Sequence, residues 1–213
     1  MRRILKKIAN LTASFFILGI ILIITGCVQR PPSNINNICA IFYENSKWYR
    51  SALKAEKHWR IPASVIMAVI YQESHFKARA KPPRLHIFWI IPWKRASSSY
   101  GYAQAITGTW QLYKRSTGHH FARRTSISDT CDFIGWNLNL AHRYLSYPVD
   151  DAYHLYLAYH EGIGNFRRGS YRQKKWLLKI AQKVEKRAVL YQEQFNQCRT
   201  SLKGRSHFFG LFR

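Results

Sequence analysis

The chain has 213 residues, 47% of them hydrophobic, and its 34 lysines and arginines against 10 acidic residues give a formal net charge of +24. This hydrophobic content, with only 11 glycines and 7 prolines, excludes disorder for most of the chain, and the length fits one domain behind a targeting segment. So basic a protein is expected to meet polyanions, of which nucleic acid, anionic lipid and the anionic cell-wall polymer are the candidates.

Residues 1–26 have the layout of a secretory signal, with a cationic head and an apolar stretch over about residues 11–24. That stretch is shorter than the roughly 20 residues that a membrane-spanning helix needs. Export argues against nucleic acid as a partner. The segment ends in Ile-Thr-Gly-Cys27, which resembles the lipobox of bacterial lipoproteins. The alternative is an uncleaved N-terminal anchor.

The lipobox resemblance implies cleavage before Cys27 and a lipid on that cysteine. The protein is then expected to be lipid-anchored in the periplasm of a Gram-negative bacterium. No aspartate follows the cysteine as it does in many lipoproteins of the inner membrane, which favours the outer membrane. Residues 27–38 are predicted to be the lipidated cysteine and a polar tether.

If lipid occupies Cys27, three cysteines remain in an oxidising compartment, and three thiols allow at most one internal bridge. Cys39 and Cys198 flank the folded region, so the hypothesis is that they pair and tie its two ends together. Closing so long a loop is worth about 4–5 kcal/mol. Cys131 is then expected to be a buried free thiol.

The remaining chain is predicted to be all-α, with one compact domain over residues 39–200 and no strand-like alternation of any length. A long loop rich in Pro and Trp is expected at 78–98, a polar loop at 118–128, and a loose basic and aromatic tail at 201–213, which either touches anionic lipid or is a frayed terminus. Helices are predicted over about residues 40–58, 63–75, 103–117, 129–145, 149–161 and 173–197.

One acidic residue stands apart from the other nine. In the helix that begins near Pro62, positions 62, 65, 66, 69, 70 and 73 share one face and carry Pro, Val, Ile, Val, Ile and Glu. Glu73 therefore ends an apolar stripe that points toward the core. Desolvation there would raise its pKa and make it a proton donor near neutral pH. The alternative is a glutamate at a fraying helix end that extends into solvent.

Three short motifs resolve this choice. Glu73-Ser74, the run Gly-Tyr-Ala-Gln over 101–104 and the run Ala-Tyr-His-Glu-Gly over 158–162 resemble, in this order, motifs of the soluble lytic transglycosylase (SLT) family of the lysozyme superfamily. That family carries Glu-Ser, Gly-Leu-Met-Gln and Ala-Tyr-Asn-Ala-Gly on helices. The resemblance covers about residues 60–180. It implies a lysozyme-like domain that cuts peptidoglycan glycan strands.

The resemblance assigns a role to each matching residue. Glu73 would protonate the glycosidic oxygen between N-acetylmuramic acid and N-acetylglucosamine, then act as base on the 6-hydroxyl of the same sugar, which closes a 1,6-anhydro ring without a second carboxylate. Ser74 would bind near the muramyl group, and Gln104 would contact sugar or brace the cleft wall. Tyr159 would lie over Glu73 and orient its carboxylate. Tyr100, Tyr102 and Trp110 would offer faces to sugar rings, or pack in the core.

The chain also departs from the family. His160 and Glu161 replace Asn and Ala, and Trp176 falls roughly where the family has a cleft tyrosine; all three are expected at the cleft. Glu161 would either position a water for hydrolysis, as in a goose-type lysozyme, or be a rim substitution with little chemical role. The longer spacing between Glu73 and the second motif places an insertion at 81–94, predicted to be a cleft-side loop, with a buried flap as the alternative.

No metal and no cofactor are predicted. The expected partners are peptidoglycan strands and, through the N-terminal lipid, a membrane, with the protein acting as a monomer. Two other functions stay open at this point. One is a hydrolytic muramidase with the same fold, and the other is a non-catalytic murein-binding lipoprotein that retains the cleft.

Overall fold

The computed structural model describes residues 30–87, 91–95 and 97–210, with side chains described in these ranges outside 85–95 and 205–210. The predicted signal segment at 1–26, the lipidation site Cys27 and the final residues 211–213 lie outside the described residues. Among the residues that are described, no helix combines the length and the apolar character needed to cross a membrane.

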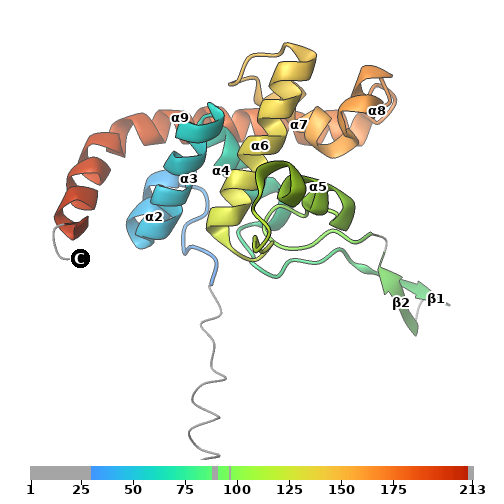
Figure 1. The fold of residues 1–213 in the computed structure, drawn as a ribbon, viewed down its shortest axis with the longest axis horizontal. Helices are drawn as coiled ribbons and strands as arrows, with labels where there is room; N and C mark the ends of the chain where they lie inside the picture. Colours follow the sequence, from blue (N-terminus) through green and yellow to red (C-terminus); the bar gives the residue numbers. More distant parts are fainter. Residues whose placement is uncertain (1–29, 88–90, 96, 211–213) are drawn as a thin grey trace, which may run out of the picture. The chain divides into compact units, whose positions relative to one another are not determined.

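The described part of the chain is built mainly from helices, which confirms the all-α class (Figure 1). The helices are α2 (Ile38–Glu44), α3 (Ser46–Trp59), α4 (Ala63–Ser74), α5 (Thr107–Thr117), α6 (Ile127–Leu145), α7 (Ala152–Glu161), α8 (Ile163–Arg167) and α9 (Lys175–Gly210).

The insertion between α4 and α5 departs from this class. It contains two short antiparallel strands, β1 (Arg84–Ile87) and β2 (Ile91–Arg95), so the expectation of a strandless loop at 78–98 is wrong for this segment. Figure 1 shows the hairpin extending away from the helices. Strands this short contain too few residues to show an alternating hydrophobic pattern. They are defined by the hydrogen bonds between them, which the sequence of either segment does not reveal.

Three helix boundaries also differ from prediction. The helix expected at 40–58 is interrupted at Asn45, whose side chain accepts a hydrogen bond from the Lys47 N–H at 2.9 Å and so caps α3. The helix expected from residue 103 starts at Thr107. The tail expected to be loose from residue 201 continues α9 to Gly210, and the buried Leu202 packs this extension against the core.

Helix α4 is the central element of the core. Its residues Ala63 to Ile70 are all buried, so it is apolar around its whole circumference, as expected of a helix enclosed by others. It packs mainly against α9 and also contacts α3 and α6. Each fully buried Val or Ile contributes about 1.5–3 kcal/mol. This packing sets the position of the C-terminal turn of α4, which carries Glu73.

A covalent bond joins the two ends of the helical domain. Cys39 in α2 and Cys198 in α9 form a disulfide with a Cα–Cα distance of 6.1 Å, across 159 residues of sequence. Cys131 in α6 is buried and is not bonded to another cysteine. The bridge therefore holds α2 against the same long helix that supports α4.

Candidate active site

Glu73 lies in the last turn of α4 and lines a pocket of about 600 Å³. The pocket collects residues from α4, the segment 82–109, α6 and α7, which are far apart in sequence. Its lining residues are Glu73, Pro82, Pro83, Ser97, Ser99, Gln104, Ala105, Ile106, Thr109, Phe133, Asn137, Tyr159, His160, Glu161 and Gly162.

The environment of Glu73 favours its protonated form. Burial raises the pKa of this carboxyl from its ordinary value of 4.5 to about 7, although a hydrogen bond from Tyr156 acts in the opposite direction. The Tyr156 hydroxyl donates to Glu73 Oε1 at 3.0 Å. Glu73 is thus able to hold and release a proton near neutral pH, and one defined donor orients it.

The residue that orients Glu73 corrects the prediction from sequence. Tyr159 was expected in this role, but its hydroxyl donates instead to the Ala103 carbonyl at 2.6 Å. Tyr156, three residues earlier on α7, takes the place. Residues three apart share a helix face, so the sequence placed a second hydroxyl on the correct side without showing which one reaches the carboxylate.

Tyr159 and Gln104 build one wall of the pocket. The bond from Tyr159 ties the turn at 101–105 to α7. Within this turn, Gln104 Nε2 donates to the carbonyls of Gly101 at 2.8 Å and Ala80 at 3.0 Å. Of the two roles predicted for Gln104, the structure therefore supports bracing of the cleft wall.

Gly101 allows the turn at 101–105 to approach the backbone at Arg124 closely. Its φ is +80°, and a Cβ built there would lie 2.1 Å from the Arg124 carbonyl oxygen. The Tyr102 N–H donates to that same oxygen at 3.2 Å. Only glycine fits both the left-handed backbone and the close approach.

Glu161, which also lines the pocket, is held by several donors. Its carboxylate accepts two hydrogen bonds from Lys174 Nζ, at 2.7 and 2.8 Å, and another from the Ser170 hydroxyl. Burial alone would raise the pKa of Glu161, but the hydrogen bonds from Lys174, Ser170 and His160 outweigh it and lower the pKa. Glu161 is therefore ionised, and its oxygens are occupied.

This ionised carboxylate decides how His160 faces the pocket. His160 Nδ1 lies 3.2 Å from Glu161 Oε1. A carboxylate only accepts hydrogen bonds, so Nδ1 carries a proton and donates a hydrogen bond to Glu161. The exposed Trp176 contacts the His160 ring edge-on at 5.3 Å, beside the pocket and not among its lining residues.

Several residues predicted to bind substrate lie away from the pocket. Ser74 is buried and its hydroxyl donates to the Ile70 carbonyl at 3.1 Å, within its own helix. Tyr102 is fully buried against Trp48. Tyr100 lies half-buried between the cations of Lys81 and Arg124. None of the three lines the pocket, whereas Gln104 and Ala105 of the turn at 101–105 do.

The insertion contributes to the pocket at its N-terminal edge. Pro82 and Pro83 are lining residues, which agrees with a cleft-side segment. The bulky side chains predicted to cap the cleft, at 88–93, fall outside the side chains that the structure describes. Their role stays a prediction.

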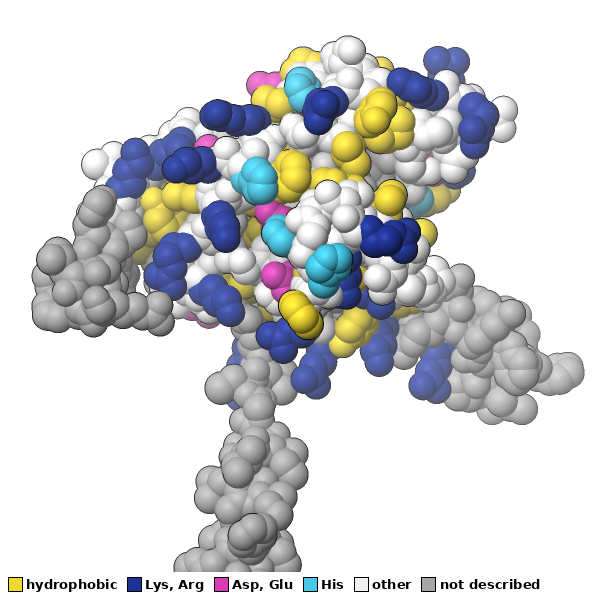
Figure 2. Space-filling model, in the orientation of Figure 1, with side chains coloured by type: hydrophobic (Ala, Val, Ile, Leu, Met, Phe, Trp, Pro, Cys, Tyr) yellow, Lys and Arg dark blue, Asp and Glu magenta, His cyan; other side chains and the backbone are white. Residues whose placement is uncertain are grey.

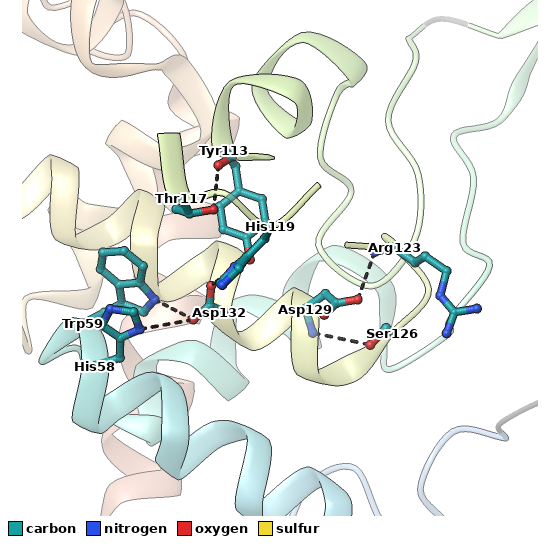
Figure 3. Close-up of polar contacts among 9 residues, drawn as sticks. All are labelled: His58, Trp59, Tyr113, Thr117, His119, Arg123, Ser126, Asp129 and Asp132. Carbon is teal, nitrogen blue, oxygen red and sulfur yellow. Dashed lines mark hydrogen bonds and ion pairs between the residues drawn. The ribbon is translucent and has the colours of Figure 1, made fainter. Parts of the chain in front are cut away.

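A second polar cluster surrounds Asp132 on α6 (Figure 3). Its carboxylate accepts hydrogen bonds from Trp59 Nε1 at 2.9 Å and from the Tyr113 hydroxyl at 2.7 Å, with the imidazole nitrogens of His119 and His58 at 3.1 and 3.7 Å. This cluster joins α3, α5 and α6. Because donors from α3 and α5 converge on this one carboxylate of α6, Asp132 acts as a structural bridge between the three helices.

In the described ranges, no group of three or more His, Cys, Asp or Glu side chains is arranged to hold a metal ion.

Comparison with known proteins yields one family. The family model described as "Transglycosylase SLT domain" matches residues 15–198, which is more than half of the chain. Searches of curated proteins and of solved structures found no match.

Proposed function

The chain belongs to the transglycosylase SLT domain family, and we propose that it is a peptidoglycan lytic transglycosylase with Glu73 as its single acid and base. The family points to lytic transglycosylase activity on peptidoglycan as the general function. The reaction proposed here is cleavage of the β-1,4 bond between N-acetylmuramic acid and N-acetylglucosamine, with formation of 1,6-anhydro-N-acetylmuramic acid.

The observation that carries this proposal is the state of Glu73. A glycosidase acid must hold its proton at the working pH, and burial raises the pKa of Glu73 to about 7. In the proposed reaction, Glu73 gives this proton to the leaving 4-oxygen. The resulting carboxylate then takes the proton of the muramyl 6-hydroxyl as that oxygen attacks C1 of the same sugar. The net proton balance is zero, so Glu73 is ready for another turnover.

The state of Glu161 favours this reaction over hydrolysis. A hydrolytic enzyme of the two-carboxylate type needs a second carboxylate that activates water or attacks the sugar. Glu161 lines the pocket, but Lys174 and Ser170 occupy its oxygens and its pKa is lowered, which makes it a weak base. A hydrolytic muramidase remains the second candidate because Glu161 is present in the pocket at all.

The partners and location proposed for the enzyme follow from the N-terminal sequence. We place it in the periplasm, anchored by lipid at Cys27 to the outer membrane of a Gram-negative bacterium, where it acts as a monomer on glycan strands. The pocket volume of about 600 Å³ lies within the usual range for ligand sites and suits a short stretch of glycan.

Mass spectrometry of digested peptidoglycan tests the reaction directly. Anhydro ends are lighter than hydrolysed ends by one water, so a spectrum dominated by anhydro ends is expected. Hydrolysed ends would instead establish a muramidase. The variant Glu161→Gln should leave the product type unchanged, whereas a muramidase that uses Glu161 as base would lose its activity.

The role of Glu73 is tested by Glu73→Gln, which keeps the shape of the side chain but cannot donate the proton. Turnover should fall by at least the 10²–10⁴-fold typical of general acid catalysis, with peptidoglycan binding retained. Glu193→Gln is the matched control, because Glu193 is exposed on α9 and does not line the pocket. If Glu73→Gln digests peptidoglycan at the parent rate, as Glu193→Gln should, then Glu73 is not the catalytic acid and the proposed mechanism fails.

A further inference from the structure

A second pocket lies between α4 and α9 and carries only positive charge. It has a volume of about 470 Å³, and it shares no lining residue with the pocket of Glu73. Its charged lining residues are Lys183, Lys186 and Arg187, and no acidic side chain contributes. The lining residues of α4 are Ala68, Tyr71 and Gln72, which lie on a different helix face from Glu73, and His75, directly after the helix, also lines the pocket.

The cations of this pocket are available to a ligand. Within the part of the chain that the structure describes, neither Lys183 nor Lys186 forms an ion pair with an acidic side chain. Glu185 lies two positions after Lys183 and so occupies another face of α9, where its charge acts on Tyr153. Lys and Arg side chains are also widespread on the face shown in Figure 2, with few acidic residues between them.

Arg187 is already held in place. Its guanidinium lies over the Tyr71 ring, 4.0 Å from the centroid, and donates to Asn36 Oδ1 at 3.1 Å. The Tyr71 hydroxyl donates to the same Asn36 oxygen at 3.3 Å. A fixed guanidinium loses little conformational freedom on binding an anion, which favours recognition.

Asn36 connects this pocket to the N-terminal tether. The preceding carbonyl, of Ile35, accepts a hydrogen bond from Tyr191, and Ser33 donates through its N–H and hydroxyl to Glu44, both at 2.8 Å. The tether is thus attached to the domain from Ser33 onward, beside the basic pocket. Only five residues separate Ser33 from Cys27, so the chain between these two Cα atoms spans at most about 22 Å when fully extended.

We propose that the pocket between α4 and α9 binds the phosphate headgroups of anionic phospholipids and docks this face of the domain on the membrane. The inference rests on the proposed membrane anchoring at the N-terminus. A tether this short keeps the attached face near the bilayer, where Lys and Arg meet a negative surface potential. Docking by this pocket leaves the separate pocket of Glu73 open to peptidoglycan.

Lysine acetylation of the full-length chain in vesicles tests the proposal. The protein is reconstituted into vesicles of phosphatidylcholine, either alone or mixed with phosphatidylglycerol, and peptide mass spectrometry gives the acetylation rate of each lysine. Lys183 and Lys186 should react about fivefold more slowly in the anionic vesicles, which corresponds to the attraction expected per cation at such a surface. Lys81, beside the other pocket, should react equally in both. Equal rates for Lys183 and Lys186 in the two vesicle types would overturn the proposal.

Charge-reversal variants separate this pocket from the general basicity of the chain. Lys179 lies one turn before Lys183 on the same helix face and reports docking in variants that lack the two lysines. The slower acetylation of Lys179 in anionic vesicles should be lost in the variant Lys183→Glu/Lys186→Glu. It should remain in the control variant Arg115→Glu/Arg143→Glu. The control changes the net charge by the same amount, but at exposed sites on α5 and α6. Loss of protection in both variants would indicate diffuse attraction and contradict a specific pocket.

Two further experiments distinguish a lipid headgroup from free phosphate, and membrane docking from the proposed enzymatic activity. Inorganic phosphate added to phosphatidylcholine vesicles should give no protection, and protection by phosphate alone would assign the pocket to a free anion and overturn the lipid assignment. Digestion of isolated peptidoglycan in detergent should be unchanged in Lys183→Glu/Lys186→Glu. That assay tests the proposed enzymatic function separately, through Glu73→Gln.

Discussion

At the scale of single residues, the burial of Glu73 suits the acid role proposed for it but has a cost in stability. Its burial at the end of α4 makes the carboxyl a proton donor near pH 7, but the same burial disfavours the ionised form. Tyr156 offsets part of this effect by donating to the carboxylate. The folded protein therefore binds a proton at Glu73 more tightly than the unfolded chain does.

This difference predicts that Glu73→Gln stabilises the protein in a pH-dependent way. Because the folded pKa of about 7 lies above the ordinary 4.5, the parent loses stability as pH rises from about 4.5 to about 7. The loss is about 3 kcal/mol, and the neutral glutamine does not incur it. Denaturant unfolding at pH 4 and pH 8 should show equal stabilities at the lower pH and a more stable variant at the higher. If the difference in unfolding free energy between the parent and the variant is the same at pH 4 and at pH 8, then Glu73 is solvated in the folded protein.

At the scale of elements, an ion pair between Glu161 and Lys174 links the end of α7 to the start of α9. Glu161, at the C-terminal end of α7, has a side chain only 3% exposed, and Lys174, just before α9, is 40% exposed. Their bond joins residues 13 apart, across α8. It also supports His160 in the pocket wall.

Removing the lysine should therefore destabilise the fold more than removing both partners. Lys174→Met leaves a buried carboxylate without its cation and should cost about 2–3 kcal/mol, less than a fully enclosed pair because Lys174 is partly solvated. The double variant Glu161→Gln/Lys174→Met should recover much of that loss. Denaturant unfolding of both single variants and the double variant measures the coupling. Strictly additive losses would rule out the pair as the support of this segment.

At the scale of the whole molecule, the disulfide connects the ends of the helical domain. It joins α2 to α9 across 159 residues, so it restricts the unfolded chain strongly. By the loop-entropy relation, the variant Cys39→Ser/Cys198→Ser should lose about 5 kcal/mol of stability. Thermal unfolding with and without reductant provides the measurement. The parent should shift down with reductant and the variant should not respond, while Cys131→Ala, which keeps the bridge, should respond like the parent.

The sequence by itself determined the class of the fold and the central residue of the site. The apolar run that begins near Pro62 predicts the helix α4, and the stripe that ends at Glu73, taken together with the three motifs, indicates that this carboxyl points inward. The order of the three motifs indicated the family that the comparison found. Both the hydrophobic pattern and the motifs involve residues close together in the chain, so they can be recognised without knowing how the helices pack.

Only the tertiary structure decided which groups meet. Periodicity places Tyr156 and Tyr159 on one face of α7, but the distance to α4 selects Tyr156 as the donor to Glu73. Lys174 reaches Glu161 because α8 turns the chain back toward α7, and the β1–β2 pairing arises between segments that show no strand pattern. A helix face shows which way a side chain points, whereas its partner depends on how the helices pack, and that packing is a property of the whole folded chain.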